Sequence, residues 1–184
     1  MDETRAREPE TVLQAARRIH ALRQTEVAPY LELYPRLLAE VPEIMVSWDR
    51  QTQELPWSAI AETERQNNLV SVITRVIDCA LSDATRDLRV EAMIGAACAH
   101  GESRRAQGIP VDSLFREYDL LRSATWGQLT TLAASPTSYG AIFVIDGLLS
   151  VATRATVLGY HRAEMHANGL WASHLDELKQ TVRS

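Results

Sequence analysis

The sequence VDSLFREYDLLRSATWGQLTTL, residues 111–132, decides the fold class because its apolar residues recur with the period of an α-helix. At about 3.6 residues per turn, these positions share one side of a single helix. The stripe consists of Val111, Leu114, Phe115, Tyr118, Leu121, Thr125, Leu129 and Leu132. Pro110 suits the first position of this helix, and Asp112 lies in its first turn, where the helix dipole favours an acid. The stretch therefore predicts an amphipathic helix with one face in a core.

Helical patterns continue on both sides of this stretch. Helices are predicted over residues 59–81, after an N-cap at Ser58, and over residues 84–107, before a terminating glycine at 108. The last long helix is predicted from near Ser138 to residue 168. These segments show no alternating pattern of a strand pair, so the fold class is all-α.

The N-terminal part is expected to be more broken. An amphipathic helix is predicted from Glu10 to Leu22, and 48–56 is predicted to be a loop. Three prolines should divide the stretch between them into short helices, namely Pro29, Pro35 and Pro42.

We predict a single-domain bundle of about six to eight helices, for which a globin-like arrangement is one option. Its boundaries would be a flexible tail at 1–9, a helical domain at 10–168, and a helical extension or linker at 169–184.

Composition argues against several functional classes. The chain has 184 residues, of which 46% are hydrophobic, and its net charge of -5 disfavours binding to nucleic acid. Cys79 and Cys98 lie inside apolar helical patterns, which is typical of reduced thiols in the cytoplasm. The N-terminus lacks the apolar region of a signal peptide, and the most apolar run, 141–145, is broken by Asp146. We therefore expect a cytoplasmic protein without a membrane span.

Several polar residues occupy positions where the helical pattern expects apolar ones. Arg122 falls inside the stripe of residues 111–132 and Glu117 lies on its border. On the preceding helix, Arg104 shares the apolar face and His100 lies at its edge, while Asp146 interrupts the last long helix. An unpaired charge in a core costs several kcal/mol, so these groups should be paired or should line a cavity.

Two interpretations of these residues remain open. Arg104 or Arg122 would pair with Glu117 or Asp146, giving either a buried ion-pair network that orients three helices or a polar pocket for a small ligand. If Arg122 is buried, its replacement by alanine should cost about 3 kcal/mol.

The run Gly95-Ala96-Ala97-Cys98-Ala99 has little side-chain bulk. Another helix is expected to approach it closely.

No motif indicates catalysis or a metal site. The chain has five histidines, but none stands in the context of a nucleophilic triad. His161 and His166 are five residues apart, which places them on different faces of a helix and disfavours shared metal binding. The glycines are scattered, so no phosphate-binding loop is predicted.

One string of residues resembles a known family. It begins with His100-Gly101-x-x-Arg104-x-x-x-Gly108 and continues with Val111-Asp112-x-Leu114-x-x-Glu117-Tyr118-x-x-Leu121-Arg122. Later, Ile145-Asp146-x-x-Leu149 and Tyr160 extend the likeness. The string resembles the N-terminal domain of RsbT co-antagonist proteins of the RsbRD type, found in stressosomes and ahead of histidine kinases and other regulators.

The resemblance covers about residues 85–160 and implies an all-helical, homodimeric sensory or regulatory input domain. The family motif falls on the same off-pattern polar residues, which are His100, Arg104, Glu117, Tyr118, Arg122 and Asp146. A downstream signalling protein or an output module outside this sequence would carry the response. His174 lacks the neighbours expected of a kinase phospho-acceptor.

Three functional hypotheses follow. The first is a non-enzymatic signalling input domain that senses near Arg104 and Arg122 and transmits through the last long helix. The second is a haem or tetrapyrrole carrier in which His100 ligates the iron. The third is a small enzyme that uses the arginines and acids for acid–base chemistry, which requires a carboxylate open to a cleft.

Overall fold

The computed structural model describes residues 14, 28–52, 60–82, 86–132 and 136–167. Within these ranges the protein forms six helices and no strand, which confirms the predicted all-α bundle. In chain order they are α2 (Ala28–Ala39), α3 (Val41–Thr52), α4 (Glu62–Leu81), α5 (Arg86–Ala106), α6 (Val111–Leu132) and α7 (Pro136–Ala167). The predicted helix from Glu10 to Leu22, the tail 1–9 and the extension 169–184 lie outside the described residues, apart from Gln14.

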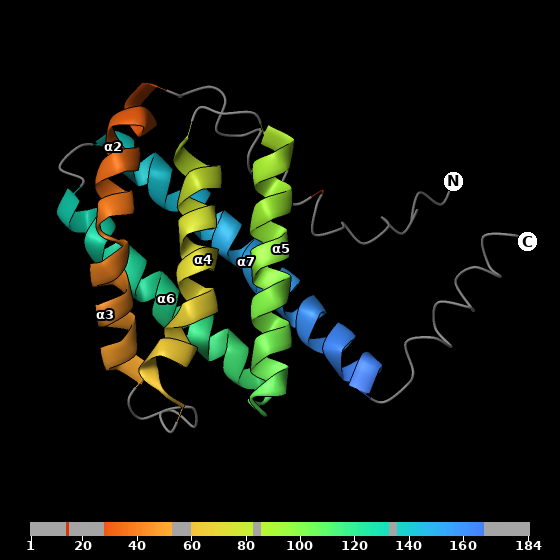
Figure 1. Ribbon diagram of the computed structural model, residues 1–184. Helices are drawn as coiled ribbons and strands as arrows, with labels where there is room; N and C mark the ends of the chain where they lie inside the picture. The colour runs from red at the N-terminus through yellow and green to blue at the C-terminus, as the bar shows by residue number, and fades with distance from the viewer. Residues whose placement is uncertain (1–13, 15–27, 53–59, 83–85, 133–135, 168–184) are drawn as a thin grey trace, which may run out of the picture.

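The helices form two layers. Helices α2 and α3 follow one another on one side of α4, with α5 on its other side, and α6 and α7 cross obliquely behind them (Figure 1). Helix α7 packs against α5, α4 and α6, and α3 packs against α6. The core between the layers contains large apolar side chains from every helix, such as Leu37, Ile73, Met93 and Leu149.

The boundaries of the long helices follow the predicted punctuation closely. Gly108 has a φ of +73°, and its N–H donates to the carbonyl of Arg105, so this glycine ends α5 in a left-handed conformation as predicted. Asp112 lies in the first turn of α6. Helix α7 begins at Pro136, two residues before the predicted start.

Three local predictions were wrong. Residues 48–52 continue α3 instead of forming a loop, because Trp48 points inward and anchors this turn in the core with no exposed surface. Pro35 lies inside α2 and does not divide it. The residue that caps α4 is Ala61, which makes no side-chain cap hydrogen bond, and not Ser58.

Helix α7 is, by length and composition, apolar enough over Gly140–Ala167 to cross a membrane, contrary to the expectation that Asp146 breaks the run. Packing accounts for part of this composition, because α7 contacts α2, α4, α5 and α6 and 44% of the apolar stretch is buried.

The expected close approach occurs between α5 and α7. A Cβ atom added at Gly101 would lie 1.9 Å from the carbonyl oxygen of Thr156, and one added at Gly159 would lie 2.1 Å from that of Cys98. The thiol of Cys98 donates to the carbonyl of Ala155 across the same crossing. Backbone meets backbone here, at Cys98 inside the small-residue run 95–99 and at Gly101 just after it.

Candidate functional site

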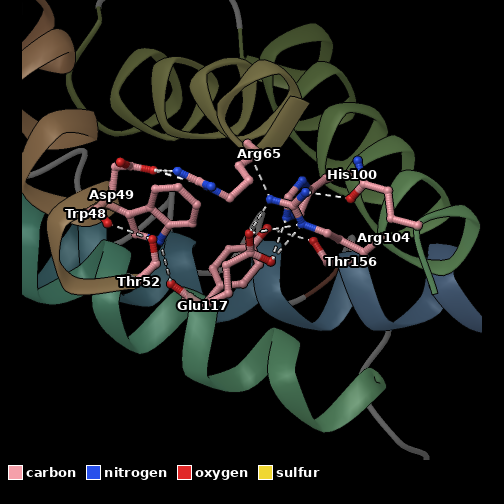
Figure 2. Close-up of polar contacts among 10 residues, drawn as sticks. Trp48, Asp49, Thr52, Arg65, His100, Arg104, Glu117 and Thr156 are labelled. Carbon is pink, nitrogen blue, oxygen red and sulfur yellow. Dashed lines mark hydrogen bonds and ion pairs between the residues drawn. The ribbon is translucent and has the colours of Figure 1, made fainter. Parts of the chain in front are cut away.

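Glu117 of α6 is the centre of a buried ion cluster. Its side chain is 1% exposed, and its Oε2 lies 3.1 Å from Nε2 of His100 (Figure 2). Its Oε1 accepts hydrogen bonds from Arg104, at 3.1 Å from Nε and 2.5 Å from Nη2. Two nitrogens of Arg104 thus converge on one oxygen, Nε also lies 3.3 Å from Oε2, and burial makes this a strong charge-assisted contact.

Arg104 also connects the cluster to a third helix, α4. Its Nη2 donates to the backbone carbonyl of Arg65 in α4 at 2.7 Å, and its Nη1 donates to Oε1 of Gln107 at 2.7 Å. Every nitrogen of the guanidinium group therefore has an acceptor, and its charge is balanced by Glu117.

His100 is the incompletely bonded member. The ring has no exposed surface, and its edge meets the ring of Tyr118 with 6.2 Å between centroids. Because the Glu117 carboxylate accepts from Nε2, this nitrogen carries the proton. The other nitrogen, Nδ1, is buried and has no hydrogen-bond partner.

Tyr118, the next residue of α6, binds α7 instead of α5. Its hydroxyl lies 2.6 Å from Oγ1 of Thr156, which donates onward to the backbone carbonyl of Ala97 in α5. Both side chains are fully buried. Consecutive residues of α6 thus hold different neighbours.

The contribution of α3 and α4 was not predicted from the sequence. The indole N–H of Trp48 donates to the backbone carbonyl of Glu117 at 3.2 Å, and the side chain of Arg65 pairs with Asp49 at 2.7 Å (Figure 2). The wrong loop assignment at 48–56 hid both residues of α3. Had the helix been extended by one turn, Trp48 would have stood on the apolar face with Ile44 and Met45.

Arg122 and Asp146 form a separate, half-exposed site and do not join the cluster. Nε of Arg122 lies 2.5 Å from Asp146, while its other nitrogens reach Asp119 and Ser150. The side chains of Arg122 and Asp146 are 22% and 35% exposed. The predicted α6 stripe is right at its centre and wrong at its edge: Glu117 points inward, whereas Arg122 and Phe115 turn toward solvent. Its central members, Leu114, Tyr118, Leu121, Thr125 and Leu129, are buried as predicted.

The electrostatics of the cluster favour an ionised Glu117. Burial alone would raise the pKa of this carboxyl, but the charges and hydrogen bonds of His100 and Arg104 outweigh it and hold the pKa below its usual value. Burial also raises the pKa of the Tyr118 phenol, so this group stays protonated and can donate to Thr156.

This arrangement limits what the cluster can do chemically. Acid–base catalysis requires a carboxylate that a substrate can reach, whereas Arg104 and Glu117 are both 1% exposed and bonded to each other. Haem ligation by Nε2 of His100 would require the iron to displace Glu117. The geometry at His100, Arg104 and Glu117 therefore supports neither of these two hypotheses, and the contacts of these residues hold α4, α5 and α6 together.

A shallow hollow of about 380 Å³ opens on the outer side of α6 beside Arg122. It is lined by Asp119, Arg122, Ser123, Trp126, Gly127 and Thr130. Trp126 is 41% exposed here, and a Cβ at Gly127 would meet nothing within 4 Å.

Comparison with known proteins gives one informative result. Neither a curated protein nor a solved structure matches the chain. The model of one family, described as the RsbT co-antagonist protein rsbRD N-terminal domain, matches residues 32–173, which include every described helix from the second turn of α2 onward. The chain therefore belongs to the family of RsbT co-antagonist protein rsbRD N-terminal domains.

Proposed function

We propose that this chain is a non-catalytic input domain of a stressosome-type signalling protein, that it works in the bacterial cytoplasm, and that it acts as a homodimer. Membership of the rsbRD N-terminal family carries the proposal. The closed state of the Arg104–Glu117 pair agrees with it, because the most polar part of the interior serves helix packing. A downstream signalling protein, or an output module joined to the domain, would receive the signal through α7.

The outer face of α6 and α7 supports the dimer. Contacts from Tyr118 to Thr156 and from Arg122 to Asp146 show that the two helices run in opposite directions. Helices α6 and α7 carry four of the exposed large hydrophobic side chains, which are Phe115, Trp126, Phe143 and Leu158. No described helix covers the side of α6 and α7 that faces away from α4 and α5 (Figure 1).

The order of residues along the two helices suits a second copy of the chain. Trp126 and Phe143 lie beyond the Arg122–Asp146 pair at one end, and Phe115 and Leu158 lie at the other end. A two-fold axis near that pair would bring the apolar side chains of one copy against those of its partner, because an isologous interface uses the same patch on both subunits. Phe143, which is 77% exposed, would then be buried against the partner.

Sedimentation velocity on the full chain and on Phe143→Glu tests the dimer. We expect a dimer at micromolar concentrations and a dissociation constant that rises at least about tenfold in the variant, the scale of a lost interface anchor. Leu88→Glu is the matched control, because Leu88 is 72% exposed on α5, in the other layer. It should leave the dissociation constant unchanged.

The same two variants test the signalling role in cells. In the parent bacterium, F143E should change the induction of a stress-response reporter, and L88E should not. A monomeric wild-type chain at every accessible concentration would refute the dimer, and equal reporter induction in all three strains would refute the input role.

A further inference from the structure

We infer that Glu117 and Tyr118 form a latch that ties the position of α7 to the buried ion cluster. Only the role of α7 as the output helix rests on the proposed function. Glu117 binds α5 through His100 and Arg104, whereas Tyr118 binds α7 through Thr156. These two consecutive residues thereby connect the layers.

The latch reaches all the helices around this turn of α6. Arg104 extends the Glu117 half to the backbone of α4, and Trp48 of α3 donates to the Glu117 carbonyl. Thr156 extends the Tyr118 half back to α5 through the carbonyl of Ala97. Five helices, α3 to α7, therefore meet at two residues.

The two halves move together because they share one turn of rigid backbone. Neighbouring residues of a helix are separated by about 1.5 Å along the axis and about 100° around it. A hydrogen bond tolerates only a few tenths of an ångström and a moderate change of angle. A rotation of α6 that draws Glu117 away from Arg104 also draws Tyr118 away from Thr156, so loss of one half loosens the other.

The composition of the cluster indicates that it is more than a filler of the core. A buried ion pair is often no more stable than apolar side chains of the same volume. The unpartnered Nδ1 of His100 is a further cost of placing polar groups here. What the polar groups add is directional: they favour one rotation of α6 over others, because a hydrogen bond depends on angle as well as on distance.

A double-mutant cycle on the full chain tests the latch by denaturant unfolding. Thr156→Val removes the hydroxyl that binds Tyr118 and should lower the folding equilibrium constant about tenfold in the wild-type background. In a Glu117→Gln background the Tyr118 contact is already loosened, so the same substitution should lower it less than about threefold. No hydrogen bond joins Glu117 to Thr156, so a coupling between them passes through the helices that carry their shared neighbours, Tyr118 on α6 and Ala97 on α5.

Two controls sharpen the cycle. Thr156→Ser keeps the hydroxyl and should show no dependence on the residue at 117. Glu102→Gln removes an exposed ion pair between α5 and α7, with Arg162, and T156V should retain its tenfold effect in that background. If E117Q does not fold, His100→Gln replaces it as the background, since it removes the histidine and keeps the ion pair.

Equal effects of T156V in the wild-type, E117Q and E102Q backgrounds would refute the latch. So would an equally reduced effect in E117Q and E102Q, because that result would report general destabilisation. Neither result bears on dimerisation, which sedimentation measures separately.

Discussion

Substitution of the glycines at the α5–α7 crossing gives the sharpest prediction of stability. Alanine at Gly101 would place Cβ 1.9 Å from the carbonyl oxygen of Thr156, about 1.5 Å inside the ordinary contact distance of 3.4 Å. The atom it meets is backbone, so no side-chain rotation relieves the overlap. The two helices must separate by more than an ångström.

The magnitude follows from what the separation breaks. Two hydrogen bonds cross this junction, from Cys98 to Ala155 and from Thr156 to Ala97, and each contributes about 1 kcal/mol. Overpacking in a tight core adds about 1 to 3 kcal/mol. We therefore expect G101A to destabilise the domain by about 3 to 5 kcal/mol, which corresponds to a fall in Tm of roughly 6 to 20 °C.

Two other glycines provide the control. Gly95 and Gly127 also lie inside helices, but an added Cβ at either would meet nothing within 4 Å. Alanine there should stabilise the domain by about 0.5 to 1 kcal/mol, because it removes backbone freedom from the unfolded chain. Calorimetry of G101A, G95A and G127A tests the set. A G101A protein as stable as the wild type would mean that the two backbones do not touch.

Three further outcomes are expected. Arg122→Ala should cost about 1 kcal/mol by chemical denaturation, well below the scale expected for a buried arginine, because its pair with Asp146 is half-exposed; a loss of about 3 kcal/mol would place the pair in the interior. The lowered pKa of Glu117 stabilises the fold at pH values above 4.5, the ordinary pKa of the group, and this stability is lost as the pH falls through the native pKa. The acid limb of a stability–pH curve should therefore flatten in Glu117→Gln, and an unchanged limb would contradict the assignment. The raised pKa of Tyr118 stabilises the fold at pH values below 10.0, the ordinary pKa of the phenol, and this contribution is lost at higher pH. Tyr118→Phe should therefore weaken the decline in stability above pH 10, and an identical decline in wild type and variant would refute this prediction.

Periodicity predicted the long helices well because each has one face in a continuous core. The C-terminal end of α5 follows from Gly108, and the start of α6 follows from Asp112. The local chemistry of both residues acts without help from the rest of the fold. At Trp48 the local signal was weaker than tertiary packing. Residues 48–56 were predicted to be a loop, yet the indole is buried against α6 and residues 48–52 stay helical.

The polar residues were found from their spacing, but their arrangement was only partly predicted. Arg104 and Glu117 pair in the interior as expected, and His100 joins them. Arg122 and Asp146 also pair, but at the surface. A stripe defined to within one residue leaves an uncertainty of about 100° in direction, which is enough to exchange an inward position for an outward one.

Arg104 contacts α4 through the main-chain oxygen of Arg65, and the side chain of Arg65 turns away to Asp49. Substitution scanning along α4 would report the role of that side chain in holding α3 and remain blind to the oxygen, which every amino acid supplies. Only chemistry that alters the peptide group itself, such as replacing an amide by an ester, would reveal how much this main-chain contact contributes to the packing of α5 against α4.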